Sequence, residues 1–244
     1  LVQDNSEKAA GWDQDLEQVL SKDNIATLSR IVIPTHYLYA QPKALQKTID
    51  DPRIDIEMWL SGKLVEIFAR KENAAFVKGD GQGKPQGFVT YSVNKVGGEI
   101  ERVSGDGPTI TYENLMKLYF ALDKRYVSGS VFIASRSALQ AIRMLKEERS
   151  GRYIWQHSLA SGMPETLMGI PIYQCDEMPE IGDTEHNTPI AFGNFRIGYQ
   201  IVDRSNVRTL RDPYTDKPYV KFYTTKQVGG GVVEPKAIKL LELR

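Results

Sequence analysis

The stretch that most constrains the fold runs from Asp51 to Gly87 and predicts one long helix followed by a glycine-rich turn. Apolar residues recur there at steps of three and four, which is the spacing of one helix face and not of a strand. The stripe consists of Ile56, Trp59, Leu60, Leu64, Ile67, Phe68 and Ala75, with the stem of Lys71. We expect the helix to run from Pro52 to about Val77 with Asp51 as its N-cap, a length of about 39 Å. Such a helix is expected to act as a spine for the fold.

The end of this helix is marked by glycine and proline, because glycine accepts positive φ and proline cannot continue a helix. The turn contains Gly79, Gly81, Gly83, Pro85 and Gly87. A phosphate-binding loop would need Gly-Lys followed by Ser or Thr, but Pro85 follows Gly83-Lys84. A dinucleotide-binding glycine motif opens a helix, whereas this segment follows one. We therefore predict a helix-ending turn and no phosphate site.

The composition is that of a globular protein of 244 residues, with 41% apolar and 25% charged residues. No apolar run approaches the roughly 18 residues that cross a bilayer, so we expect no membrane association. The 31 basic and 31 acidic residues cancel, which argues against a protein whose main task is to grip a polyanion. The single cysteine, Cys175, excludes an internal disulfide and fits a reducing compartment. The chain begins at Leu1 without a signal-peptide pattern, and we expect that an original start has been processed away or is disordered.

The N-terminal part is expected to form an exposed arm and an extended ribbon. Residues 1–24 are polar and acidic, and residues 25–40 are rich in β-branched and aromatic types with one break at Pro34. The latter segment predicts a kinked edge strand or the two arms of a ribbon. A ribbon of this kind is rarely stable alone, so we expect it to need a neighbour, which another chain could supply.

The rest of the chain predicts an α+β fold. After a strand at 88–93, Thr111 caps a helix with an apolar face to Tyr126, and a buried strand at 131–135 precedes a third helix that ends at Gly151. Beyond Gly151 the pattern changes to short strands, with a turn at 211–218 and two final strands on either side of Gly229-Gly230-Gly231.

Candidate catalytic and metal-binding residues are few. Cys175, His157 and Asp176 are the grouping that a thiol nucleophile with a base would need, yet Cys175 follows an alternating strand in which a packed apolar role is commoner. His36, His157 and His186 have no ligand spacing for zinc. We therefore predict no catalytic residues, no metal site and no cofactor, and hence no enzyme.

Five sequence segments occur within residues 37–244 in an order that is typical of one protein family. They are FVKGDGQGKPQGF, LKEERSGRYIWQ, GMPETLMGIPIY with DEMP, IAFGNFRIGYQIVDR, and LRDPYTDKPYVKFYTTKQVGGGVVEPKAIKLL. Together they resemble the major capsid proteins of tailed bacteriophages and prophages with the Hong Kong 97-type fold. The chain departs from the family in having Gln227 where Arg is usual and Asn194 where Asp is usual. Neither difference threatens the fold.

The resemblance implies a division into domains. Residues 1–40 would form an extended loop and strand that reaches over a neighbouring subunit. Residues 41–90 and 205–230 would form a peripheral domain with the spine helix, and residues 91–204 and 231–244 an axial domain.

The resemblance also implies the function of a structural virion protein. Copies of the chain would self-assemble through hexamers and pentamers into an icosahedral phage or prophage head, in the host cytoplasm, around double-stranded DNA that they do not bind specifically. The partners implied are scaffold, prohead protease, portal and decoration proteins. The alternative within the fold is an encapsulin-like nanocompartment shell, and the alternative from another class is a cysteine hydrolase acting through Cys175.

Some members of this family join subunits by an isopeptide bond between a loop lysine and an asparagine, assisted by a glutamate. Residues 212–228, which would supply the last two partners, contain neither Asn nor Glu. We therefore predict no such bond. Boiled shells should give one band at the mass of a single subunit on a denaturing gel, and a ladder of covalent multimers would contradict this prediction.

Overall fold

The computed structural model describes residues 2–4, 28–49, 55–91, 99–146, 151, 153–155, 165–183 and 187–244. The chain divides into two units, residues 1–33 and residues 34–244. In the first unit, β1 (Val2–Asp4) pairs antiparallel with β2 (Leu28–Arg30). The second unit contains two sheets, which are described in turn.

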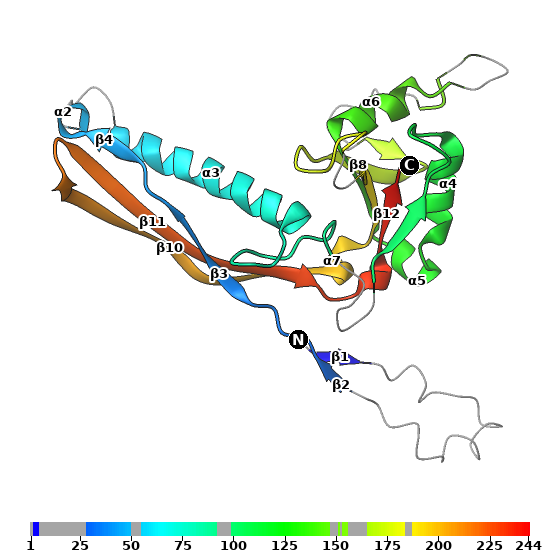
Figure 1. Cartoon of the computed structure of the whole chain (residues 1–244), viewed down its shortest axis with the longest axis horizontal. Coiled ribbons are helices and arrows are strands. Elements are labelled where there is room, and N and C mark those ends of the chain that lie inside the picture. The colour runs from blue at the N-terminus through cyan, green and yellow to red at the C-terminus, as the bar shows by residue number, and fades with distance from the viewer. Residues whose placement is uncertain are drawn as a thin grey trace. The chain divides into compact units, whose positions relative to one another are not determined.

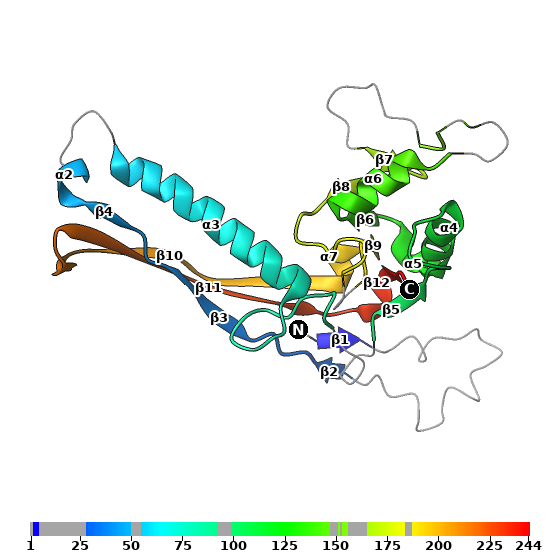
Figure 2. The same cartoon turned by 45° about the horizontal axis from the view of Figure 1, so that its top comes forward.

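The first sheet is built on a long antiparallel hairpin. Its strands are β10 (Tyr199–Asp216), β11 (Tyr219–Val232), β3 (Thr35–Ala40) and β4 (Lys43–Leu45), in the order β10–β11–β3, with β4 also on β11. Of the kinked strand predicted over residues 25–40, the part after Pro34 is confirmed as β3, an edge strand that pairs with β11 of the same chain. In both views the helix α3 (Ile56–Lys78) runs along this hairpin (Figure 1, Figure 2).

The turn predicted over residues 211–218 is confirmed in its position but is shorter than expected. β10 is continuous to Asp216, and the chain reverses at Lys217-Pro218 before β11 begins, so the strands expected to be separate between residues 197 and 212 are one strand. Three shifts of register along β10 accommodate residues that do not fit a regular ladder, including Pro213. Bulges of this kind keep a strand paired where the local sequence signals a break.

The helix α3 begins at Ile56, not at Pro52. Asp55 is its N-cap, because the backbone N–H of Met58 donates to the Asp55 carboxylate at 2.9 Å. Short α2 (Gln46–Ile49) precedes it. Asp51 was therefore the wrong cap, and residues 51–54 lie outside the described part of the chain.

One row of α3 is buried, and it is narrower than the predicted stripe. Leu60, Leu64 and Phe68 follow one another at four-residue steps, and Leu60 packs on Val220 and Phe222 of β11. Such a row winds about 40° around the helix at each step, so a helix that follows it lies obliquely on a sheet. A narrow sheet then covers only this row. Trp59 and Ile67 also belong to the predicted stripe, but they are 58% and 42% exposed, whereas Ile56 and Ala75 are half-buried.

The predicted end of the helix is confirmed, but the role of its first glycine differs from the expectation. Gly79 caps α3 with φ of −63°. A Cβ there would lie 2.0 Å from the carbonyl oxygen of Pro85, so close approach requires the glycine. The chain folds back so that Phe88 and Val89 donate to the carbonyls of Phe76 and Val77, both at 3.1 Å. Residues 88–91 therefore form a turn that closes the helix, and the strand predicted from residue 88 was wrong over this part.

The second sheet is six-stranded and mixed, in the order β5–β12–β9–β6–β8–β7. Its strands are β5 (Glu101–Ser104), β12 (Ile238–Glu242), β9 (Ile190–Gly193), β6 (Val131–Ala134), β8 (Ile170–Gln174) and β7 (Thr166–Leu167). The β12–β5 and β6–β8 pairs are parallel, and the other pairs are antiparallel. The buried strand predicted at 131–135 is thus confirmed as β6, and β7, β8 and β9 are short strands of the kind predicted beyond Gly151.

Helices supply most of the remaining core of this sheet. They are α4 (Tyr112–Ala121), α5 (Lys124–Val127), α6 (Arg136–Met144), α7 (Phe195–Gly198) and the 3₁₀ turn η3 (Pro235–Ala237). The main core brings together fully buried residues of helices and strands, among them Leu115, Leu118, Phe132, Ile142 and Phe192. None of the helices in the described ranges is long and apolar enough to span a membrane.

The helix starts in this part were better predicted than the helix ends. Thr111 caps α4 by accepting from the N–H of Asn114 at 3.2 Å, as predicted. The helix does not reach Tyr126, because Asp123 caps the separate helix α5. Likewise α6 ends at Met144 and not at Gly151, and residues 147–150 lie outside the described part.

The triglycine run does not separate two strands but lies within β11. A Cβ on Gly230 would lie 2.5 Å from the hydroxyl oxygen of Tyr199 and 2.9 Å from the ring of Phe76. The Tyr199 hydroxyl donates to the carbonyl of Gln86 at 2.8 Å, and burial raises its pKa well above the ordinary value of tyrosine. Glycine therefore lets the end of α3, the start of β10 and the end of β11 meet.

A second link between α3 and the sheet is ionic. The Lys226 ammonium lies 2.7 Å from the carboxylate of Glu72 on α3 and 3.1 Å from that of Asp203 on β10. The Lys226 and Glu72 side chains are mostly buried. Burial alone would lower the pKa of Lys226, but hydrogen bonds and charge attraction from both carboxylates outweigh it and raise that pKa.

The burial of Leu118 in the core of the second sheet lets us predict how far a cavity there would lower the free energy of unfolding. Leu118→Ala should lower the free energy of unfolding by about 2–5 kcal/mol, because Leu118 is fully buried. Phe120→Ala on the same helix is the matched control, since Phe120 is 72% exposed and its loss should change stability by less than about 0.5 kcal/mol. Urea unfolding of the unassembled chain measures both. Equal losses would contradict the assigned core.

The ionic link predicts a dependence on pH. Lys226→Met should lower the free energy of unfolding by about 1–3 kcal/mol at pH 7, because it leaves Glu72 without its cation. A raised lysine pKa stabilises the folded state fully below the ordinary value of about 10.4, and the benefit is lost as the pH rises through the folded-state pKa. The difference between wild type and variant should therefore shrink above about pH 10.5.

Unfolding curves at pH 7, 9 and 11 measure this difference. Lys63→Met is the control, because Lys63 pairs with Glu66 at 2.8 Å on the exposed side of the same helix and should matter little at any pH. A loss at Lys226 that stays constant up to pH 11 would show that packing, and not charge, accounts for it.

Candidate functional site

The face of the first sheet that points away from α3 carries exposed aromatic and aliphatic side chains. Alternate residues of β11 point to opposite faces, and Val220 and Phe222 are buried on the helix side. Tyr223 therefore points away from the helix. Tyr223 lies opposite Leu210 of β10, and its ring centroid is 6.3 Å from that of Tyr39 on β3. The three side chains form one apolar row across three strands.

This row is more exposed than a folded monomer usually tolerates. Tyr39 is 67% exposed and Leu210 is 63% exposed, and Tyr37, two residues along β3 on the same face, is 73% exposed. We call Tyr37, Tyr39, Leu210 and Tyr223 the sheet row. Contiguous exposed apolar side chains usually mark a surface that another molecule covers.

The helix α3 also exposes apolar residues on the side opposite its buried row. Met58 is 73% exposed and Val65 is 69% exposed, and no atom outside the helix lies within 4 Å of a Cβ placed on Gly62 between them. At 100° per residue these three positions lie close together on the helix surface. The layer formed by α3 and the first sheet thus has apolar side chains on both outer faces.

The structure does not assemble the candidate cysteine site of the alternative reading within the described residues. Cys175 is half-buried and packs against the second core cluster, and its N–H donates to the carbonyl of Ala134 at 2.9 Å. Asp176 accepts from the side-chain amide of Gln174 at 2.8 Å. His157 lies outside the described part of the chain.

The three histidines are not brought together in what the structure describes. His36 lies on β3 in the first sheet, and His186, like His157, falls outside the described ranges. Across those ranges no three His, Cys, Asp or Glu side chains gather as a metal would need.

The backbone N–H groups of the glycine-rich turn close the C-terminal end of α3. Gly87, Phe88 and Val89 all donate their N–H groups to backbone carbonyls at the end of the helix or just after it. A phosphate loop needs free N–H groups at a helix N-terminus, whereas these are satisfied at a C-terminus. The predicted helix-ending turn is therefore confirmed.

The sheet row was missed by sequence reasoning, although its signal was present. In the segment THYLYA of β3, both tyrosines occupy alternate positions and so share one face of the strand. Which face a helix covers depends on residues far along the chain, and this could not be read from the segment alone. The error at Trp59 and Ile67 has the same origin.

Comparison with known proteins gives the family. The model of the phage capsid family matches residues 1–243. No sequence among the curated proteins matches the chain.

Solved structures agree with this match. The chain is similar to the capsid of a native GTA particle, with 36% identity and a TM-score of 0.85 over 100% of this chain and 84% of that one. It also has the fold of a protein of Gordonia phage Cozz, with 13% identity and a TM-score of 0.66 over 100% of this chain and 80% of that one. The SrpI encapsulin of Synechococcus elongatus PCC 7942 shares the fold at 16% identity, with a TM-score of 0.63 over 91% and 79% of the two chains.

These similarities confirm the α+β capsid fold that the resemblance of the five sequence segments implied. The family match covers nearly every residue, and the GTA capsid aligns over the whole chain. The chain therefore belongs to the phage capsid family and is a phage major capsid protein.

Proposed function

We propose that copies of this chain associate as hexamers and pentamers that close into an icosahedral shell around double-stranded DNA. The observation that carries the proposal is the sheet row of Tyr37, Tyr39, Leu210 and Tyr223, which is apolar, contiguous and uncovered in one chain. Its burial between subunits would supply the non-directional part of the association energy. Many such contacts under closed symmetry give a finite particle.

The two sheets support a division of the subunit into domains. We propose that residues 41–90 and 205–230 form the peripheral domain, residues 91–204 and 231–244 the axial domain, and residues 1–40 the extended loop and strand. The cluster around Leu60 lies within the first of these regions and the cluster around Leu118 within the second, while a third cluster joins Val77 and Phe88 to Ile238 and Leu240 across the boundary. Pairing of β3 with β11 attaches the strand part of residues 1–40 to the peripheral sheet.

The zero net charge of the chain suits a shell that encloses DNA without binding it strongly. Equal numbers of acidic and basic residues limit repulsion between packed subunits and limit counterion-driven binding of DNA. We propose assembly in the bacterial host cytoplasm with scaffold, prohead protease, portal and decoration proteins as partners, and no enzymatic step by this chain.

Two alternatives are less well supported. An encapsulin-like shell rests on a likeness of fold alone, at 16% identity. A cysteine hydrolase would need a base beside Cys175, and in the described ranges Cys175 has a packing role. Nucleic-acid content distinguishes the first alternative, because a nanocompartment would hold protein and no genome. Cys175→Ala addresses the second, since shell formation should be unchanged.

The proposal predicts that charges on the sheet row block association. Tyr39→Lys combined with Leu210→Lys should leave the fold intact, because both side chains are exposed, yet it should place two cations in a buried contact. Sedimentation velocity of the full chain, expressed with its scaffold and protease, should show loss of the shell peak for this variant.

Tyr112→Lys is the matched control, because Tyr112 is an exposed tyrosine on α4 outside the sheet row, and it should leave the shell peak in place. Circular dichroism verifies that each variant is folded. Normal shells from a folded Tyr39→Lys/Leu210→Lys variant would contradict the proposed role of the row.

A further inference from the structure

An open groove of about 650 Å³ lies between α6 and β8, near one end of the second sheet. Arg136, Gln140 and Arg143 of α6 line it at steps of four and three residues, so they share one face of the helix. All three are exposed, and Met144 beside them is 64% exposed. We call these four residues the α6 face.

The α6 face carries one cation without a partner. The side chain of Arg136 makes no ion pair or hydrogen bond with any residue that the structure describes. Arg143 is paired with Glu165, and its guanidinium lies 5.4 Å from the centre of the Trp155 ring. The face therefore offers an unpaired guanidinium and an exposed apolar side chain to another molecule.

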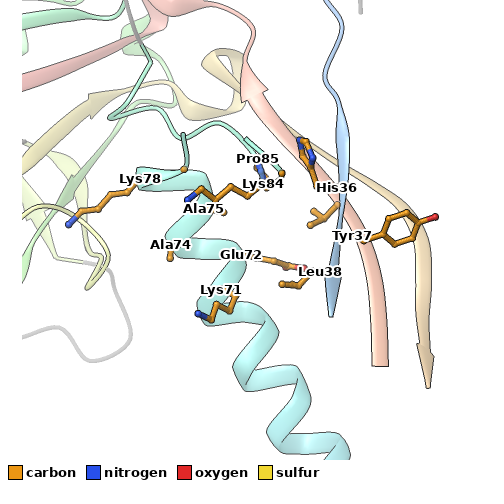
Figure 3. Close-up of a pocket in the computed structure, with 13 residues that line it drawn as sticks. His36, Tyr37, Leu38, Lys71, Glu72, Ala74, Ala75, Lys78, Lys84 and Pro85 are labelled. Atoms are coloured by element: carbon orange, nitrogen blue, oxygen red, sulfur yellow. The ribbon is translucent and has the colours of Figure 1, made fainter. Parts of the chain in front are cut away.

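A second cavity, of about 400 Å³ between β3 and the C-terminal half of α3, does not supply the acid that Arg136 lacks (Figure 3). Glu72 is the one acid among the lining residues that the structure describes, and Figure 3 shows it extending from α3 toward Leu38 of β3. Its carboxylate is mostly buried and lies 2.7 Å from the Lys226 ammonium of the same chain. Glu72 is therefore not accessible to a neighbouring copy.

An accessible acid lies toward the other end of the second sheet, where α4 packs on β12 and β5. Glu113, Lys117 and Phe120 follow one another on α4 at steps of four and three, so they also share an exposed face. Phe120 is 72% exposed, and Lys117 is paired with Asp106. The Glu113 side chain makes no ion pair or hydrogen bond within the described ranges. Tyr112 lies about 100° around the helix from Glu113 and outside this face.

We call Glu113, Lys117 and Phe120 the α4 face, and it is complementary to the α6 face. Glu113 and Arg136 are opposite charges without partners in the described residues. Each is followed on its helix by an exposed apolar side chain, Phe120 or Met144, after seven or eight residues. These spacings correspond to about 10–12 Å of helix, so both pairs can meet in one contact. A thioether beside an aromatic ring is a favourable contact.

We propose that the α4 face of one copy packs against the α6 face of the next copy, with Glu113 paired to Arg136 and Phe120 in contact with Met144. The two faces lie toward opposite ends of one sheet, so each copy would use its α4 face on one neighbour and its α6 face on the other. A repeated head-to-tail contact of this kind gives a ring when its rotation closes. This inference rests on the proposed function, and it names the surfaces that join subunits within a hexamer or pentamer.

Reversal of the two charges tests the ion pair. Glu113→Arg alone and Arg136→Glu alone should each lower the fraction of the chain in shells at least about tenfold, because like charges then meet in every repeated contact. The double variant Glu113→Arg/Arg136→Glu should restore that fraction to within about twofold of wild type. Sedimentation velocity of the full chain, expressed with its scaffold and protease, measures the fraction.

Arg196→Glu is the matched control, because Arg196 is an exposed arginine on α7 outside both faces, and it should leave the fraction unchanged. Circular dichroism verifies that each variant is folded. Normal shells from both single variants, or a folded double variant that stays unassembled, would overturn this inference and leave the proposed shell standing. A wild-type chain that forms no shells would overturn the proposed function and, with it, this inference.

Cross-linking tests the head-to-tail arrangement. Lys117→Cys combined with Gln140→Cys, in a chain that also carries Cys175→Ala, places one thiol at the middle of each face and keeps the four contacting side chains. A short bismaleimide should link assembled subunits into a ladder that ends at pentamers and hexamers on a denaturing gel, because each copy is joined to two neighbours. Products no larger than a dimer, or unlinked subunits from intact shells, would contradict the inference.

Discussion

The contact between α3 and β11 is the interaction on which the first sheet depends. A two-stranded hairpin as long as β10–β11 has too little core of its own, and α3 supplies it through the row Leu60, Leu64 and Phe68. Lys226 adds an ionic link from the same strand to Glu72 on the helix. Because only one row of α3 is used, the rest of its apolar surface stays exposed.

Close approach of the backbone at Gly230 lets the layer formed by α3 and the first sheet continue into the second sheet. Gly230 permits Phe76 and Tyr199 to pack over β11, and the turn after α3 returns beneath them. The cluster formed there also contains Ile238 and Leu240 of β12, which is an inner strand of the second sheet. A side chain at position 230 would therefore disturb the end of α3 and the strand at once.

The sequence predicted those features that local chemistry decides. The cap at Thr111, the buried strand at 131–134 and the helical period of α3 depend on neighbouring residues, and they could be read directly. The continuity of β10 through Pro213 could not, because long-range pairing with β11 overrides the local break. The sheet row was missed for the same reason, since its meaning depends on which face α3 covers. The family was recognised from five sequence segments spread over some two hundred residues, and hydrophobic periodicity alone would not have identified it.

Cryo-electron microscopy of particles formed by the full chain with its scaffold and protease tests the central claim most directly. The account predicts closed icosahedral shells in which a neighbouring subunit covers Tyr39, Leu210 and Tyr223. Particles in which this row faces solvent at every subunit, or a chain that remains monomeric under these conditions, would contradict it.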